Sequence, residues 1–483
     1  KRALLIDDCD RFRSVEDPQC SPDGKWIAYT VSASDVATDS RRSSLWMVSF
    51  DGTEDLQLTL GKDADSTPRF SPDGRSIAFL SARPADGPTQ VWVLDRRGGE
   101  ARALTHVAGH IEDFAWSPDG KRLALVMRER TDATAPPKPI VIDRFGFKSD
   151  IEGYLESSAT RRLYLFDIGT KDLTPLTGDT LHDEHDPAWS PDGKRIAFVS
   201  NHATEPDRSN TNDIFVVEAR PGARPAKIVT AWAPNSQRIA WSPDGRLISY
   251  LVGEEPRYYA YAQDRLAVVP SAGGEPRALT AGFDRKVSAP AFSADGASIT
   301  VMVEDDRVQY PARVPVAGGA VERIVEGTLV VTAQCTGGGR SAMLVSTDTM
   351  PPEIHALEGK RLRKLTGHND ALMAQLALGA VEDIAFPSED GTMIHGLMVK
   401  PPSYRAGRKY PTILWIHGGP NMQDDHSLPV DTYALQAERH LLAAQGYVVL
   451  AVNYRGSSGR GDAFARTIFA DWGNREVADL RAA

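Results

Sequence analysis

Cysteine is scarce in this sequence, and long hydrophobic runs are missing altogether. Three cysteines among 483 residues exclude a disulfide framework as the basis of the fold. Cys9 and Cys20 could pair in an oxidising compartment, but we favour the interpretation that they are buried or idle thiols. No run of 18 apolar residues occurs, so the sequence predicts no membrane span.

Basic stripes, phosphate-binding loops and metal-ligand spacings are also missing. The net charge is −10 and Lys and Arg do not cluster, which argues against a nucleic-acid partner. Without a metal or phosphate motif, we expect no cofactor. The content of 41% hydrophobic and 25% charged residues is typical of soluble globular proteins, and 483 residues exceed one ordinary domain. The sequence therefore predicts two domains.

The first residues do not include a starting methionine. The chain opens on Lys1-Arg2, so we expect that a start residue, a tag or a signal peptide precedes it. The compartment is not determined by this feature. We favour a bacterial periplasmic or secreted protein after removal of a signal peptide, with a cytoplasmic protein as the alternative.

What the sequence does contain is a repeated tight turn, Ser-Pro-Asp-Gly. In this turn Pro sets φ at the first central position, Asp bonds its own backbone, and Gly supplies a positive φ. An aromatic residue usually precedes each copy, and a short apolar run follows it, which predicts one β-hairpin per copy. The copies begin at Ser21, Ser71, Ser117, Ser190 and Ser242, with a worn form, Ser-Ala-Asp-Gly, at Ser293.

Successive copies lie about 50 residues apart, which is typical of a β-propeller with one four-stranded blade per repeat. Short strands, most of them ending in Leu-Thr or a near relative, close the repeats. They end at Thr59, Thr105, Thr177, Thr230, Thr280, Val325 and Thr366. Six turns against seven closing strands leave one turn missing, and we assign it to Gly337–Ser346. The sequence thus predicts an all-β propeller of seven blades.

Two stretches of the propeller region depart from the repeat. Residues 128–161 lengthen one repeat by roughly 20 residues, and such insertions often form a loop on the binding face. A surface excursion without a role is the equal alternative. Residues 254–263 hold Tyr258, Tyr259 and Tyr261. Packing between blades is our favoured interpretation of these tyrosines, and a ligand-contacting surface is the other.

The pattern changes after Thr366, where longer apolar runs replace the short repeats. Strands are predicted at 381–386, 393–400, 412–416 and 447–454, with a helix at 431–445. The run at 412–416 is continuous, as in a buried parallel strand, and strand, helix and strand at these lengths form a βαβ unit. We therefore predict a propeller over residues 1–370 and the first part of an α/β-hydrolase domain over residues 371–483.

A glycine-rich loop, His417-Gly418-Gly419-Pro420, follows the predicted strand at 412–416. In α/β-hydrolases a loop at this place gives one backbone N–H to the oxyanion hole, and glycine is needed because a Cβ would block the close approach of substrate. His417 precedes any nucleophile in the chain, whereas the hydrolase order is nucleophile, acid, base. We therefore expect His417 to orient the loop and not to act as the base.

No Gly-x-Ser-x-Gly nucleophile elbow occurs in the 483 residues. Ser457 and Ser458, in Arg455-Gly456-Ser457-Ser458-Gly459, belong to a glycine-rich loop and do not form one. Arg455 is either a contact for a substrate carboxylate or an ion-pair residue. His395 and His440 fall within a predicted strand and helix, where packing or exposure explains them best.

The order of these motifs resembles the prolyl oligopeptidase family of serine peptidases, and most closely its bacterial acylaminoacyl-peptidase-like branch. The shared features are the Ser-Pro-Asp-Gly propeller, then Ile416 to Pro420, then Asn453 to Gly461, then Asp471-Trp472-Gly473. The resemblance covers essentially the whole chain. It implies that the propeller restricts access to short peptides. It also implies that Gly419, the second glycine of the loop, donates its N–H to the oxyanion.

The family's nucleophilic Ser, its Asp and its His are expected beyond Ala483, so none of the triad is assigned to these residues. We expect a remaining C-terminal hydrolase segment as partner, together with a short peptide substrate; a homo-oligomer is also possible. The leading hypothesis is part of a serine exo- or oligopeptidase acting by acyl-enzyme chemistry. A non-catalytic propeller scaffold and an esterase on the same fold are the alternatives. The sequence does not decide between acylaminoacyl, dipeptidyl, carboxypeptidase-like and endopeptidase specificity.

Overall fold

The computed structural model describes residues 1–483 except 62–63, 84–86, 130–138, 143–144, 150–152, 155–159, 179–180, 210, 232–238, 254–255 and 431–434. Most of the insertion at 128–161 and the start of the helix predicted at 431–445 lie outside the described residues. No helix in the described ranges is long and apolar enough to cross a membrane.

Residues 13–364 form successive sets of four antiparallel strands. The first two sets are β1 (Arg13–Cys20), β2 (Trp26–Asp35), β3 (Ser40–Ser49) and β4 (Asp55–Gln57), then β5 (Ser66–Phe70), β6 (Ser76–Ser81), β7 (Gln90–Asp95) and β8 (Arg102–Ala103). The next two are β9 (Gly109–Trp116), β10 (Arg122–Glu129), β13 (Arg161–Asp167) and β14 (Leu173–Pro175), then β15 (Glu184–Trp189), β16 (Arg195–Ser200), β17 (Asn212–Glu218) and β18 (Ala226–Ala231). A small hairpin, β11 (Lys148–Ser149) and β12 (Gly153–Tyr154), lies in the insertion.

The last twelve strands of this region form two sheets. They are β19 (Ala240–Trp241), β20 (Leu247–Val252), β21 (Arg265–Pro270) and β22 (Arg277–Ala278), then β23 (Lys286–Phe292), β24 (Ser298–Asp305), β25 (Val308–Pro315) and β26 (Glu322–Arg323), then β27 (Val330–Gly337), β28 (Arg340–Thr347), β29 (Met350–Glu358) and β30 (Arg361–Lys364). The β19–β22 set stands alone, but one parallel pair, Gln309 with Val330, joins β23–β26 to β27–β30 in a single eight-stranded sheet. The count of seven blades therefore stays a prediction.

Each Ser-Pro-Asp-Gly copy forms the predicted hairpin turn. In the copy at Ser190, the Ser hydroxyl donates to Asp192 Oδ1 at 2.6 Å, and the N–H of Gly193 donates to the carbonyl oxygen of Ser190 at 2.9 Å. Gly193 has a φ of +67°, which a residue with a side chain rarely adopts. The other five copies repeat these two bonds. The missing turn is also present, because β27 and β28 pair as a hairpin with Gly337 opposite Arg340.

The turns pack on one another from set to set. A Cβ added to the glycine of one turn would lie 3.4–3.6 Å from the proline of the preceding turn, as for Gly74 on Pro22 and Gly296 on Pro243. In the β1–β4 set, the position of Gly24 faces Gly337 of the last hairpin, where an added Cβ would lie 2.5 Å from the carbonyl oxygen. The first set therefore packs closely against the last one.

A disulfide joins these two sets, which corrects our interpretation of the cysteines as idle thiols. Cys20 at the end of β1 is bonded to Cys335 in β27, 315 residues away, and Cys9 is the free cysteine. The partner was not predicted because the pairing depends on the packing of the first set against the last one and not on sequence spacing. Around Cys335, a buried core mixes side chains of both sets: Val15, Ile27, Tyr29, Val31, Val48, Phe50, Ala342, Leu344, Ile354, Ala356 and Leu365.

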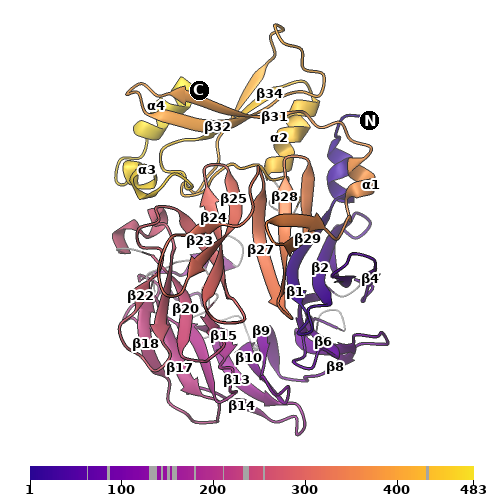
Figure 1. Cartoon of the computed structure of the whole chain (residues 1–483), viewed down its shortest axis with the longest axis vertical. Helices are drawn as coiled ribbons and strands as arrows, with labels where there is room; N and C mark the ends of the chain where they lie inside the picture. The colour runs from indigo at the N-terminus through magenta and orange to yellow at the C-terminus, as the bar shows by residue number, and fades with distance from the viewer. Residues whose placement is uncertain are drawn as a thin grey trace.

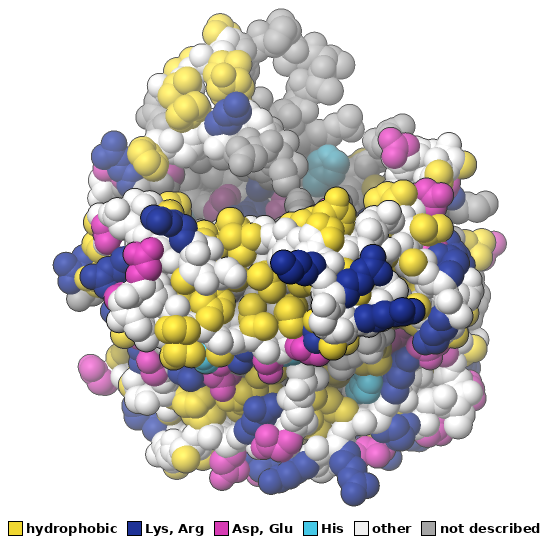
Figure 2. All heavy atoms as spheres, turned by 90° about the horizontal axis from the view of Figure 1, so that it is seen from above, with side chains coloured by type: hydrophobic (Ala, Val, Ile, Leu, Met, Phe, Trp, Pro, Cys, Tyr) yellow, Lys and Arg dark blue, Asp and Glu magenta, His cyan; other side chains and the backbone are white. Residues whose placement is uncertain are grey.

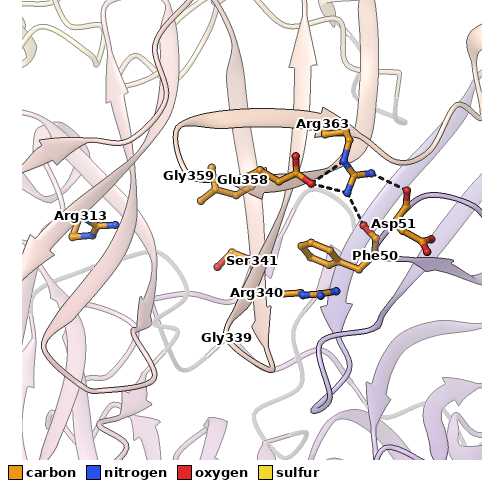
Figure 3. A pocket seen from close by; sticks show the side chains of 10 residues that line it. Phe50, Asp51, Arg313, Gly339, Arg340, Ser341, Glu358, Gly359 and Arg363 are labelled. Atoms are coloured by element: carbon orange, nitrogen blue, oxygen red, sulfur yellow. Dashed lines mark hydrogen bonds and ion pairs between the residues drawn. The ribbon is translucent and has the colours of Figure 1, made fainter.

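Arg363 adds a polar connection between the same sets. Its guanidinium donates to the backbone oxygens of Phe50 and Asp51, each at 2.9 Å, and pairs with Glu358 at 2.8 Å. Figure 3 shows this group at the edge of a pocket of about 520 Å³, with Arg340 below the ring of Phe50. Covalent, apolar and polar contacts all hold the two ends of the propeller region together.

A second, smaller sheet follows residue 380 and lies above the four-stranded sets in Figure 1, on the side where both chain ends lie. Its strand order is β31 (Val381–Pro387), β32 (Met393–Val399), β34 (Val448–Asn453) and β33 (Thr412–Trp415), and only β33 and β34 run parallel. The helices of this region are α1 (Asp370–Met373), α2 (Leu435–Ala444), α3 (Asp462–Ala465), η3 (Arg466–Ile468) and α4 (Arg475–Ala482).

The burial predicted for residues 412–416 is wrong, although the parallel pairing with β34 is confirmed. Within the described chain β33 is an edge strand, with 38% of Leu414 and 52% of Ile416 exposed. The residues of β33 thus have the continuous apolar composition of an interior strand, although the strand lies at an edge of the described sheet. Figure 2 shows hydrophobic side chains gathered across the upper face of the molecule. The exposed apolar residues of this sheet region include Met393, Tyr404, Leu414, Ile416 and Tyr447.

Residues 1–12 lie outside the four-stranded sets. The segment contains η1 (Ile6–Arg11), and its Leu4 and Phe12 pack in one buried cluster with Leu372, Leu376 and Val430. Arg2 also forms a backbone bridge with Leu376. The N-terminus is therefore attached to the connector that leads into the second sheet.

Candidate functional site

The glycine loop lies directly after β33, at the carboxyl end of the strand. Gly418 and Gly419 are both exposed, and Gly419 has a φ of +125°. A Cβ at Gly419 would lie 2.9 Å from Cγ of Met422, so the loop has no room for a side chain there. Among the backbone hydrogen bonds of the described chain, none uses the N–H of Gly418 or Gly419 as donor. The loop thus presents free donors at the edge of the sheet.

His417 fixes the orientation of this loop, as predicted. Its Nδ1 donates to the carbonyl oxygen of Gly418 at 2.8 Å, so in the neutral ring Nε2 accepts a hydrogen bond from the Ser457 hydroxyl at 2.9 Å. The Tyr454 hydroxyl donates to the carbonyl oxygen of His417 at 2.6 Å, and the two rings stack. Both ring nitrogens of His417 are therefore hydrogen-bonded, and these bonds hold the ring against the loop.

The serines near the loop are buried. Ser457 has no exposed surface and bonds to His417, and the Ser458 side chain bonds to Glu304 of β24. The N–H of Ser458 donates to the carbonyl oxygen of Met422 at 3.0 Å. Neither hydroxyl is presented to solvent, in agreement with the expectation that this motif is not a nucleophile elbow.

Arg455 makes the ion pair that was one of its two interpretations. Its guanidinium is buried and bonds both oxygens of Asp479, which is fully buried in α4, and it also bonds Asp390. Asp479 raises the pKa of Arg455 further above its usual value, and Arg455 lowers the pKa of Asp390. The guanidinium joins the β31–β32 turn to the last helix, and its donors bond the two carboxylates together with Ser388, Thr392 and the carbonyl oxygen of Arg475.

A polar segment, residues 421–430, follows the glycine loop and lies along the loops of the propeller region. Asn421 donates to the carbonyl oxygen of Ala262 at 3.0 Å. Further along, Gln423 accepts from the N–H of Arg307 at 2.9 Å and donates to the carbonyl oxygen of Val308 at 3.2 Å. Sequence reasoning missed this segment, because no local pattern identifies contacts with residues more than 100 positions away.

The same segment continues across the last and the first four-stranded sets. The N–H of Leu428 donates to the Ser346 hydroxyl at 2.9 Å, and the Ser14 hydroxyl donates to the carbonyl oxygen of Val430 at 3.1 Å. Between these contacts, His426 bonds Asp348 and Asp383 at once. The segment therefore connects the glycine loop to four successive parts of the propeller region.

A buried ion pair supports the segment from the side of α2. The side chains of Arg439 and Asp424 are each about 4% exposed, and Nη1 lies 3.1 Å from Oδ1. Burial raises the pKa of Asp424 and raises that of its neighbour Asp425 to about 6. Asn453 of β34 completes the contact by bonding the backbone N–H and carbonyl oxygen of Asp424.

Tyr258 and Tyr261 pack against the second sheet region, which corrects the prediction of packing between blades for these two residues. Tyr258 and Tyr261 lie in η2 (Pro256–Tyr261), and both meet the ring of Phe469 edge to face, at 4.7 and 5.9 Å between centroids. The Trp472 indole donates to the Tyr261 hydroxyl. Tyr258 and Tyr261 are packing residues, as predicted, but their partners Phe469 and Trp472 belong to the other region of the chain.

The remaining predicted features lie apart from the loop. His395 bonds Asp306 and His440 is buried in α2. No cluster of three or more metal-ligating side chains occurs in the described ranges. A cavity of about 760 Å³ opens among the inner strands of the propeller region, where Arg69 lies among the carboxylates Asp17, Glu112, Asp113 and Asp186.

Comparison with known proteins supports this architecture. Residues 11–136 match the family of the TolB beta propeller domain, and residues 433–483 match the Prolyl oligopeptidase family. The uncharacterized peptidase YuxL of Bacillus subtilis is 28% identical over 100% of this chain and 75% of its own length. Dipeptidyl-peptidase 5 of Porphyromonas gingivalis is 25% identical over 97% of this chain and 70% of its own length.

Solved structures with the same fold are peptidases. The acylaminoacyl peptidase of Pyrococcus horikoshii superposes with a TM-score of 0.78 at 20% identity, over 98% of this chain and 70% of that one. A puromycin-hydrolyzing peptidase of Mycobacterium tuberculosis gives 0.70 at 14% identity, over 100% of this chain and 74% of that one. The fold is thus a β-propeller joined to a peptidase domain. The order of propeller repeats, glycine loop and C-terminal match is thus that of a propeller followed by a segment, residues 433–483, which matches the prolyl oligopeptidase family.

Proposed function

We propose that this chain is part of a serine exo- or oligopeptidase that hydrolyses short peptides through an acyl-enzyme. The observation that carries the proposal is the free N–H of Gly419 at the carboxyl end of β33, in a loop with no room for a side chain. A backbone donor in this place stabilises the negative charge that develops on the carbonyl oxygen during attack. Gly418 supports the same turn and contributes to the oxyanion site.

The nucleophile, acid and base of this reaction would come from sequence that follows residue 483. Two observations support this part of the proposal. The matched relatives are longer, since 100% of this chain covers 75% of YuxL. The edge of β33 is apolar and unpaired in the described chain, as expected for a strand that continues into further strands of a hydrolase sheet.

The propeller would restrict access to the site. We assign residues 1–370 to a seven-bladed propeller and residues 371–483 to the hydrolase domain, with residues 1–12 packed on the connector between them. The cavity of about 760 Å³ among the inner strands has room for part of a short peptide and is too small for a folded protein. A disulfide between Cys20 and Cys335 suits a protein of an oxidising compartment, in line with a periplasmic or secreted location.

Hydrolysis by the enzyme with its complete hydrolase domain tests this function. Chromogenic amides of acylated and free-amino dipeptides should be cleaved, and a fluorophosphonate should abolish the activity by reacting with the nucleophilic serine. The 483-residue chain should be neither active nor labelled. Ester cleavage without amide cleavage would replace the peptidase by an esterase. No labelling of the complete enzyme would favour a propeller scaffold without catalysis.

A further inference from the structure

His426 occupies the point where three parts of the chain meet. It lies in the 421–430 segment, seven residues after Gly419, and its side chain is 6% exposed. Nδ1 lies 2.9 and 3.0 Å from the two carboxylate oxygens of Asp348, in the β28–β29 turn of the propeller. Nε2 lies 3.1 Å from Asp383 on β31 of the second sheet. The imidazole thus bridges the two regions of the molecule.

This geometry defines the charge of the ring. Carboxylate oxygens accept hydrogen bonds and do not donate them, so each ring nitrogen must carry a proton to bond its partner. A histidine with two protons is an imidazolium. Its backbone also takes part, because the N–H of His426 donates to the carbonyl oxygen of Arg307 at 3.0 Å.

Other charged groups surround this bridge. Arg307 pairs with Asp383 at 3.0 Å, so one of the two carboxylates keeps a cationic partner when the imidazole loses its proton. In the part of the chain that the structure describes, the ion pair of Asp348 is the one with His426. Other titratable groups on the packed elements include Asp306 in the β24–β25 turn, Glu382 on β31, His395 on β32, Asp424 and Asp425 on the segment itself, and Glu438, Arg439 and His440 on α2.

We propose that His426 is a positioning residue: as an imidazolium it holds the segment that follows Gly418 and Gly419 against both the propeller and β31, and so sets the geometry of the oxyanion loop. The link to the loop is short and continuous. Gln423 and Leu428 fasten the same segment on either side of His426. A neutral ring keeps only one N–H, so loss of the ring charge would release one of the two carboxylate contacts. The catalytic consequence rests on the proposed function, whereas the contact itself does not.

The direction of the pH effect follows from the same contacts. Burial alone would lower the pKa of His426, but Asp348 and Asp383 raise it above its usual value of 6.5. A raised pKa in the folded state means that the bridge stabilises fully below the unfolded pKa and is lost as pH rises through the folded pKa. Burial lowers the pKa of His440 to about 4, so that ring is neutral throughout this range. Burial raises the pKa of the neighbouring Asp425 to about 6.

Hydrogen exchange of the 483-residue chain tests the contact without reference to catalysis. In the wild type, peptides covering 417–430 should be protected near pH 6.5 and lose protection at alkaline pH, after correction for the intrinsic rate. The variants His426→Gln and Asp348→Asn should exchange about 10-fold or more faster near pH 6.5 and show no alkaline step. His106→Gln, which changes an exposed histidine, is the matched control and should follow the wild type. Equal protection in wild type and His426→Gln would overturn the proposal.

Kinetics of the complete enzyme provide the second measurement. His426→Gln should lower kcat about 10-fold or more with a smaller change in KM, because the oxyanion forms only along the reaction path. The alkaline limb of the kcat profile should shift or disappear in the variant. If the complete enzyme cleaves no peptide, the proposed function fails while the exchange result still decides the role of His426. If the enzyme is active and His426→Gln keeps the wild-type kcat and pH profile, the positioning role fails alone.

Discussion

Reduction or removal of the Cys20–Cys335 disulfide should destabilise the propeller region, and the size of the loss follows from the length of chain that the disulfide closes into a loop. The bond links residues 315 positions apart, from β1 to β27. The chain-entropy account gives about 6 kcal/mol for a loop of that length, and measured losses for native disulfides are about 2–5 kcal/mol. We expect a loss within the measured range, because the buried core around Cys335 and the contacts of Arg363 still hold the first and last sets together.

The melting temperature is the practical readout. A domain of roughly 350 residues has an unfolding entropy near 0.7 kcal/mol/K, so a loss of about 2–5 kcal/mol corresponds to roughly 3–7 °C. Melting curves of the wild type with and without reductant should differ by this amount, and Cys20→Ala/Cys335→Ala should melt at the lower temperature under both conditions. Cys9→Ala, which removes the free cysteine, is the matched control and should behave as the wild type.

Two results would refute this reasoning. Peptide mapping without reductant should recover Cys20 and Cys335 in one linked fragment, and recovery of free thiols at both positions would show that the bond is absent. If the bond is present but reductant leaves the melting temperature unchanged, the non-covalent contacts alone would account for the stability of the packing between the first and last sets.

The remaining predictions concern the turn contacts and the buried arginine. Gly24→Ala should lower the free energy of unfolding by about 1–3 kcal/mol, because a Cβ would lie 2.5 Å from the carbonyl oxygen of Gly337. Gly339→Ala should cost less, because Gly339 has a similar φ but open space around it. Equal losses in urea unfolding would mean that the backbone angle, and not the contact, determines the loss of stability. Arg455→Met should lower the free energy of unfolding by about 3–5 kcal/mol, because Asp479 would be left buried without its cation. The loss should be smaller when Asp479→Asn is added, and a double variant no more stable than Arg455→Met alone would contradict this explanation.

Local features of the fold could be predicted from the sequence. The Ser-Pro-Asp-Gly turns were placed correctly because Pro, Asp and Gly each act on their own turn, and the hairpin near Gly337 followed from the spacing of its neighbours. The parallel pairing of β33 with β34 also followed from short apolar runs on either side of a helix. These signals extend over a few residues, which is the range in which sequence patterns are informative.

Contacts between distant segments could not be predicted in the same way. The partner of Cys20 lies 315 residues away, and the partners of Tyr258 and Tyr261 belong to the other region of the chain. An apolar run indicates an interior strand but does not show which strands lie beside it, so the exposed edge of β33 was missed.

The candidate site also combines features that could be predicted from local sequence with features that could not. The glycine pair was recognised because its position after an apolar strand is a local pattern. The role of His426 was not, because it depends on Asp348 and Asp383, which approach it only in the folded chain. Arg455 was left open for the same reason, since Arg455 lies in the turn after β34 and Asp479 is 24 residues away on α4.

Turnover of Gly419→Ala in the enzyme with its complete hydrolase domain tests the central claim most directly. The added Cβ would meet Met422 at 2.9 Å and disfavour a φ of +125°, so the loop would move and its N–H would leave the oxyanion position. Loss of one such donor lowers kcat on the order of 100-fold or more, with a smaller change in KM. Ser457→Ala should do little by comparison, and Gly282→Ala, in open space in the propeller, should match the wild type. Near-normal kcat for Gly419→Ala together with loss of activity in Ser457→Ala would contradict the assignment of the oxyanion donor.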